Sequence, residues 1–145
     1  MAILFLFVGE RYEVSLGKAE KAKDNPVEEA SRKTVLVVED DTMVLRMVRT
    51  SLHLKGCRVL TAKDVCEAEE QWAMAHKIID VVISDNKLGV DMGAELVQRF
   101  QKQAPDVQYV LCSGAPLERE IPGVSFLMKP FNVDVILEDD KSSTN

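Results

Sequence analysis

The stretch Thr34-Val-Leu-Val-Val-Glu-Asp-Asp41 joins a short apolar run directly to three acids. A continuous apolar run of this length predicts a strand buried on both faces, as in a parallel sheet. Further apolar, β-rich runs lie at 58–61, 81–84, 107–112 and 124–128, and amphipathic segments separate them. This alternation predicts an α/β fold in which five βα units form a parallel sheet flanked by helices.

The amphipathic segments carry their own start and stop signals. Apolar residues at helical spacing predict a first helix that ends at Gly56. Asp64, with Glu67 three positions later, predicts a capped start for the second. A third helix is predicted from about Met92 to Gln103, because Pro105 prevents its continuation.

The last two helices are expected to be shortened. Residues 115–122, between the last two predicted strands, leave room for about two helical turns, so the fourth helix must be short or irregular. The fifth is also brief, from Asn132 to about Leu137, before a polar tail over residues 139–145.

Residues 1–33 precede the repeating pattern. The apolar run 1–8 is too short to span a membrane, and it lacks the basic start and cleavage site of a signal peptide. Residues 11–16 alternate like a strand, and 17–33 are interpreted as a charged linker. We therefore expect an N-terminal extension and linker before a domain over 34–138. Whether the extension packs on the domain, pairs with another chain or belongs to a larger protein stays open.

Composition excludes some partners. The 145 residues include 18 basic and 24 acidic ones, for a net charge of −6, and no basic stripe is present. Direct binding to nucleic acid or to an anionic membrane is therefore disfavoured. The three cysteines follow no metal-ligand spacing, which fits a reducing compartment and a cytoplasmic location.

Polar side chains end four of the predicted strands. Glu39 and Asp40 follow the first, Asp85 ends the third, and Ser113 and Lys129 end the last two. Because ligands of an open parallel sheet collect beyond the carboxyl ends of its strands, these side chains are expected to converge.

The three consecutive acids predict a metal site. Their mutual repulsion would be relieved by a divalent cation, and Mg²⁺ takes one or two carboxylates while keeping several waters. One acid is sufficient to cap the following helix, and we assign that role to Asp41. Glu39 and Asp40 remain as candidate ligands.

Four motifs taken together resemble a known family. They are Thr34-Val-Leu-Val-Val-Glu-Asp-Asp41, Asp85 with Gly93 eight positions on, Ser113-Gly114, and Lys129-Pro130-Phe131. Over about residues 33–138 the chain is similar to the response-regulator receiver domain of two-component systems. The resemblance implies a doubly wound, flavodoxin-like (βα)₅ sandwich with Mg²⁺ as cofactor.

The resemblance also implies chemistry. Asp85 would accept a phosphoryl group from a histidine on a sensor kinase or phosphotransfer protein. Mg²⁺ would be held by Glu39, Asp40, Asp85 and the backbone carbonyl of Lys87. The chain would then be a phosphoacceptor, and not an enzyme that turns over a separate substrate.

Three further roles follow from the same resemblance. Lys129 would pair with Asp85 and then with the phosphoryl oxygens, and Ser113 would donate a hydrogen bond to them. On phosphorylation Ser113 would move toward the phosphate and Phe126 would rotate into the vacated space, altering the surface presented to a downstream partner.

Two alternatives stay open: a pseudo-receiver that binds proteins without being phosphorylated, and the receiver segment of a hybrid histidine kinase. The oligomeric state is also open, because the shortened last helices reduce a surface through which relatives dimerise. One departure is that Gly89 stands where the family usually has proline, which should loosen the loop 86–92.

Overall fold

The computed structural model describes residues 3–7, 10–15, 18–21 and 32–138 of the chain. The chain divides into two compact units, with the boundary in the sequence between Arg32 and Lys33. None of the described helices is long and apolar enough to cross a membrane.

The first unit is an antiparallel sheet in the order β1-β2-β3, formed by β1 (Ile3–Phe7), β2 (Glu10–Ser15) and β3 (Lys18–Lys21). The predicted strand near residues 11–16 is present as β2. The interpretation of everything from Gly17 onward as linker is wrong for β3, because pairing with β2 outweighs the low β propensity of its lysines and glutamate. Residues 22–31 of that linker lie outside the described residues.

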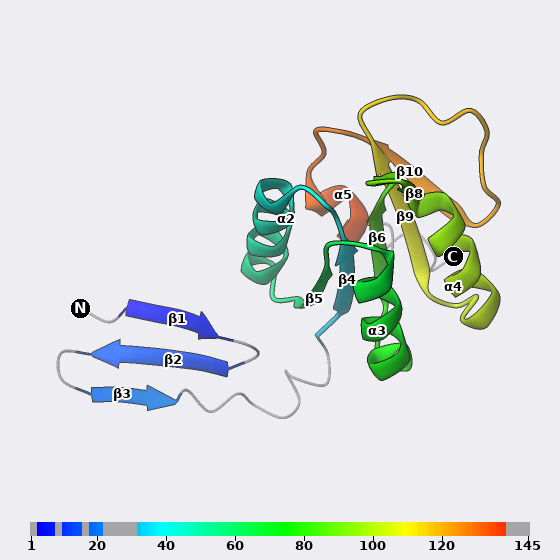
Figure 1. Ribbon diagram of the computed structural model, residues 1–145. Helices are drawn as coiled ribbons and strands as arrows, with labels where there is room; N and C mark the ends of the chain where they lie inside the picture. The colour runs from blue at the N-terminus through cyan, green and yellow to red at the C-terminus, as the bar shows by residue number, and fades with distance from the viewer. Residues whose placement is uncertain (1–2, 8–9, 16–17, 22–31, 139–145) are drawn as a thin grey trace. The chain divides into compact units, whose positions relative to one another are not determined.

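The second unit is built on the predicted five-stranded parallel sheet (Figure 1). Its strand order is β10-β9-β6-β4-β5. The strands are β4 (Thr34–Val38), β5 (Arg58–Ala62), β6 (Val81–Asp85), β9 (Gln108–Ser113) and β10 (Val124–Met128). The helices are α2 (Thr42–Leu54), α3 (Val65–Ala75), α4 (Gly93–Gln103) and α5 (Val133–Glu138). The doubly wound α/β sandwich is confirmed.

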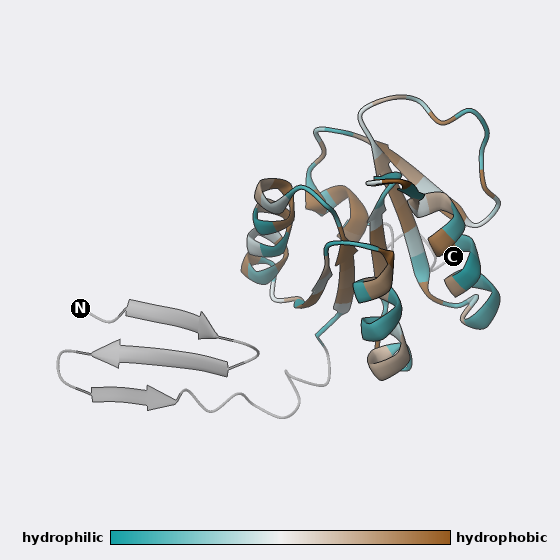
Figure 2. Cartoon of the chain, in the orientation of Figure 1, coloured by the Kyte–Doolittle hydropathy of each residue, from teal (hydrophilic) through white to brown (hydrophobic). Residues whose placement is uncertain are grey.

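The sheet is buried on both faces. Along β4, Val35 and Val37 pack with residues of α2 and α5, whereas Leu36 and Val38 pack with residues of α3 and α4. Figure 2 shows the apolar central strands between helices whose outer faces are more polar. This two-sided burial is why the strands are continuous apolar runs, and it fixes which residues can reach the polar edge.

The helix boundaries follow local signals. The side chain of Asp41 accepts hydrogen bonds from two N–H groups at the start of α2, and Gly56, at φ +84°, lies just beyond its end. Asp64 accepts from the N–H of Glu67 at the start of α3, as the sequence predicts. Trp72 is buried, stacks on Phe100 of α4 at 4.2 Å between ring centroids, and thereby joins the two helices of that face.

The fourth crossover is irregular throughout. Residues 114–123, between β9 and β10, contain no helix, and the fifth helix, α5, has six residues. The irregular segment is held by Leu117 and Ile121, which pack against the core, and by the side chain of Gln101, which donates to the Pro122 carbonyl at 2.9 Å. The fourth helix is therefore replaced by an irregular segment and the fifth is short, as the short spacing predicts.

A small hairpin that the sequence did not predict follows β6. Its strands are β7 (Lys87–Leu88) and β8 (Asp91–Met92). Leu88 is buried in the core, and Val90 at the tip is 99% exposed. Gly89 has φ +67°, which proline cannot adopt, so glycine at this position provides the turn.

The start of α4 lies directly against the end of β6. A Cβ atom on Gly93 would fall 1.9 Å from the backbone oxygen of Asp85 and 2.7 Å from Oγ of Ser84. A glycine is therefore required where helix and strand meet, eight residues after Asp85. By contrast, a Cβ on Gly114 would have no heavy atom within 4 Å.

We predict that Gly93→Ala lowers the free energy of unfolding by about 1–3 kcal/mol, because the strand end and the helix must separate to admit the methyl group. Urea denaturation followed by circular dichroism measures it. Gly114→Ala is the matched control and should change stability by less than about 0.5 kcal/mol. Equal effects of the two substitutions would contradict this account of the contact.

Candidate functional site

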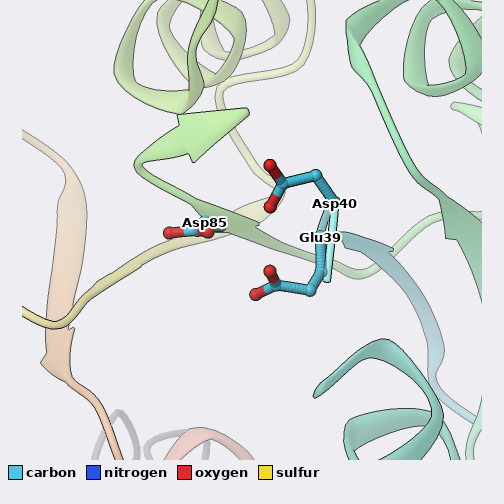
Figure 3. A group of neighbouring side chains, drawn as sticks. All are labelled: Glu39, Asp40 and Asp85. Atoms are coloured by element: carbon cyan, nitrogen blue, oxygen red, sulfur yellow. The ribbon is translucent and has the colours of Figure 1, made fainter. Parts of the chain in front are cut away.

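Three carboxylates meet at the carboxyl edge of the sheet (Figure 3). Glu39 and Asp40 directly follow β4, and Asp85 is the last residue of the neighbouring strand β6. One oxygen from each carboxylate lies within 4.8 Å of one oxygen from each of the others. From β4 the sheet continues to β5 on one side and to β6 on the other, so the cluster lies where the winding direction reverses.

The three acids differ in environment. Glu39 is only 4% exposed, Asp85 is partly buried, and Asp40 is exposed. One oxygen of Glu39 accepts the backbone N–H of Asp41 at 3.1 Å, and the other accepts from the Lys129 ammonium at 2.6 Å. Burial, together with the negative charge of Asp85, raises the pKa of Glu39 despite these two hydrogen bonds.

Lys129 follows β10, and its side chain extends along the carboxyl edge of the sheet toward Glu39 and Asp85. Its Nζ lies 2.6 Å from Oε2 of Glu39 and 3.4 Å from Oδ2 of Asp85. Partial burial by itself lowers the pKa of Lys129, but the hydrogen bond and charge of Glu39, with those of Asp85, outweigh it and raise the pKa. The ammonium is therefore held in its charged form between two acids. The family resemblance predicts that Lys129 pairs with Asp85, but it does not predict the closer contact between Lys129 and Glu39.

Ser113 and Phe126, the other two residues predicted for the site, lie on β9 and β10. Ser113 is buried at the end of β9, where its Oγ accepts from the N–H of Ala115 at 3.2 Å. Its carbonyl accepts from the backbone N–H of Lys129 at 2.8 Å. Phe126 is partly buried in β10, opposite Leu111 of β9, and packs against the core on the α3 and α4 side.

The donor set suits a hard cation. The cluster offers carboxylate oxygens from Glu39, Asp40 and Asp85, which are the ligands that Mg²⁺ prefers. Asp41 does not join it, because its Oδ1 is engaged by the N–H groups of Met43 and Val44 at 2.9 and 3.1 Å. The capping role of Asp41 is the one that the sequence predicts, and the cation-binding role of Glu39 and Asp40 stays a prediction.

Backbone groups of the β7–β8 hairpin complete the site. The N–H of Gly89 donates to Oδ2 of Asp40 at 3.2 Å, and the N–H of Lys87 to Oδ1 of Asp85 at 3.4 Å. Sequence reasoning missed the Gly89 contact. The available signal was Gly-Val between Leu88 and Asp91, since glycine first in a two-residue loop favours a tight hairpin.

Residues 35–139 match the family model described as response regulator receiver domain. Among curated proteins, the chain is 31% identical over 111 residues to the C4-dicarboxylate transport transcriptional regulatory protein DctD of Pseudomonas aeruginosa, covering 72% of this chain and 23% of that protein. It is 30% identical over 122 residues to the sensor kinase CckA of Brucella abortus, covering 77% of this chain and 13% of that protein. The chain thus spans about a quarter or less of these relatives' length.

A solved structure shares the same architecture. The Vibrio cholerae chemotaxis protein CheY4 superposes with a TM-score of 0.67 at 26% identity, over 77% of this chain and 98% of that one. The family match covers the five-stranded sheet except Thr34, and it includes Glu39, Asp40 and Asp85. The chain belongs to the response regulator receiver domain family.

Proposed function

We propose that this chain is a phosphoacceptor: Asp85 takes a phosphoryl group from a phosphohistidine and the domain signals the change to a partner protein. The observation that carries the proposal is the position of Asp85, with its carboxylate among two further acids and within 3.4 Å of a lysine ammonium. A carboxylate held between a cation-binding pair and a fixed positive charge is suited to receive a dianionic group.

The reaction needs little covalent machinery. An oxygen of Asp85 attacks phosphorus, a P–O bond forms, and the P–N bond of the donor histidine breaks with its electron pair returning to the imidazole nitrogen. Lys129 neutralises charge on the phosphoryl oxygens. Glu39, Asp40, Asp85 and the Lys87 carbonyl would hold Mg²⁺, which would supply further neutralisation of charge when bound. No general base is required, because a carboxylate nucleophile carries no proton to be removed.

The proposed output uses the strands that end at the site. Ser113 ends β9, the strand that pairs with β6, and its Oγ accepts one hydrogen bond, from Ala115, among the described contacts. We propose that it turns toward the new phosphate, and that Phe126, on the strand paired with β9, follows it. The charge of the added phosphate supplies the driving force for this change.

The partners follow from the same chemistry. We propose a sensor histidine kinase or a phosphotransfer protein as donor, in the cytoplasm, and a downstream protein as receiver of the signal. Similarity to the sensor kinase CckA of Brucella abortus supports the alternative that this domain is the receiver segment of a hybrid kinase. A pseudo-receiver is the weaker alternative, because Asp85, Lys129 and both candidate metal acids are in place.

Labelling with a phosphoryl group tests whether Asp85 is the acceptor. Incubation with acetyl phosphate and Mg²⁺ should add the mass of one phosphoryl group, measured by intact-protein mass spectrometry. Asp85→Asn should abolish the addition, because an amide oxygen is a poor nucleophile. Asp91→Asn, at the exposed hairpin, is the matched control and should label like the wild type. Labelling of Asp85→Asn to the wild-type extent would overturn the assignment.

Metal binding should stabilise the fold. Because the pKa of Glu39 is raised, its ionisation costs stability as the pH rises through that pKa, and a cation should offset this cost at neutral pH. At a hundred times its dissociation constant, Mg²⁺ should add about 2.7 kcal/mol, or roughly 10 °C in Tm. Differential scanning fluorimetry measures the rise, which Asp85→Asn should weaken. A wild-type Tm that does not respond to Mg²⁺ would refute the metal site.

Lys129 should contribute more to the free energy of unfolding without metal than with Mg²⁺ bound. Lys129→Met leaves Glu39 and Asp85 without their ammonium, which should cost about 1–3 kcal/mol in EDTA. Urea denaturation in EDTA and in Mg²⁺ measures this, and Mg²⁺ should recover part of the loss. Lys63→Met removes an exposed ion pair with Glu67 and should cost less than about 0.5 kcal/mol. An equal, small cost for both variants would contradict the pairing.

A further inference from the structure

We infer that the β7–β8 hairpin positions the metal-binding carboxylates, with the Gly89 N–H holding Asp40 and the Lys87 N–H holding Asp85. The inference rests on the proposed function, because it concerns the same cation site. It assigns Gly89 a positioning role that depends on its backbone N–H and not on a side chain.

The geometry places two donors on one short stretch of chain. The N–H groups of Lys87 and Gly89 reach Asp85 Oδ1 at 3.4 Å and Asp40 Oδ2 at 3.2 Å. Lys87 and Leu88 form β7, and Gly89 follows them at the start of the turn. Leu88, between the two donors, is 3% exposed and belongs to the hydrophobic core. One buried side chain therefore anchors both donors.

The base of the hairpin is fixed as well. The N–H of Asn86 donates to the Cys112 carbonyl at 2.8 Å, which ties the segment to β9. The N–H of Gly93 donates to the Asn86 carbonyl at 2.9 Å, which closes the hairpin onto the start of α4. The donors are thus held by the sheet, the core and a helix before any cation arrives.

Gly89 is suited to this task in two ways. Its φ of +67° is open to glycine and tolerated by asparagine, and a Cβ there would have no heavy atom within 4 Å. Proline at this position would have no N–H and could not make the contact with Asp40.

The consequence is orientation of the ligands. The contacts engage one oxygen of Asp40 and one of Asp85, leaving the other oxygen of Asp40 available to a cation. They also place N–H dipoles against crowded negative charge. Hydrogen bonds to ligating carboxylates typically change metal affinity by about 10-fold to 100-fold when removed.

Isothermal titration calorimetry with Mg²⁺ on the full chain tests the inference. Gly89→Pro should weaken Mg²⁺ binding by about tenfold, at the lower end of that range because Asp40 is exposed. Gly89→Asn keeps the N–H and should stay within about threefold of the wild type. Val90→Ala, at the exposed tip, should leave the affinity unchanged. Wild-type affinity in Gly89→Pro, or equal losses in Gly89→Pro and Gly89→Asn, would overturn the inference.

A second measurement covers the case in which Gly89→Pro does not fold. In ¹⁵N–¹H spectra without metal, Asp40→Ala should move the Gly89 amide proton upfield and speed its exchange with solvent, whereas the matched exposed control Asp91→Ala should do neither. An unmoved Gly89 amide in Asp40→Ala would refute the contact. Absence of Mg²⁺ binding by the wild type would count against the proposed function, whereas wild-type binding with no effect of Gly89→Pro would count against this inference alone.

Discussion

The organisation of the domain depends on the repulsion among three carboxylates at one edge of the sheet. Glu39, Asp40 and Asp85 offer oxygens within 4.8 Å of one another, and one of them is almost fully buried. Such an arrangement is unfavourable unless positive charge compensates it. Lys129 supplies one fixed charge, at 2.6 Å from Glu39, and backbone N–H groups of the β7–β8 hairpin supply partial ones.

The rest of the fold holds these groups in place. Burial of β4 and β6 on both faces fixes the strand ends from which the acids project, and the pairing of β10 with β9 places Lys129 beside Ser113. Gly93 lets α4 begin directly against Asp85. Strand ends position these side chains through the backbone of the sheet, and burial of the apolar core offsets the electrostatic cost of bringing the acids together.

The strands of the sheet and the acids at its edge could be predicted from the sequence, because strands buried on both faces are apolar runs and polar residues follow them. Contacts that depend on the positions of residues distant in the sequence could not be predicted. The closer pairing of Lys129 with Glu39 depends on how a side chain crosses the sheet edge. The Gly-Val pair at residues 89–90 favours a tight hairpin but does not show that the Gly89 N–H donates to Asp40. The strand β3 was missed because its lysines and glutamate predict solvent exposure, and only pairing with β2 makes it a strand.

If a cation relieves the crowding of the three acids, removing one negative charge should change the free energy of unfolding in opposite directions without metal and with Mg²⁺ bound. The free energy of unfolding of Asp40→Asn, measured by urea denaturation at pH 7, tests this most directly. Without metal the variant should be more stable than the wild type, because repulsion is reduced, and in saturating Mg²⁺ it should be less stable, because a ligand is lost. A change of the same sign in EDTA and in Mg²⁺ would contradict the account.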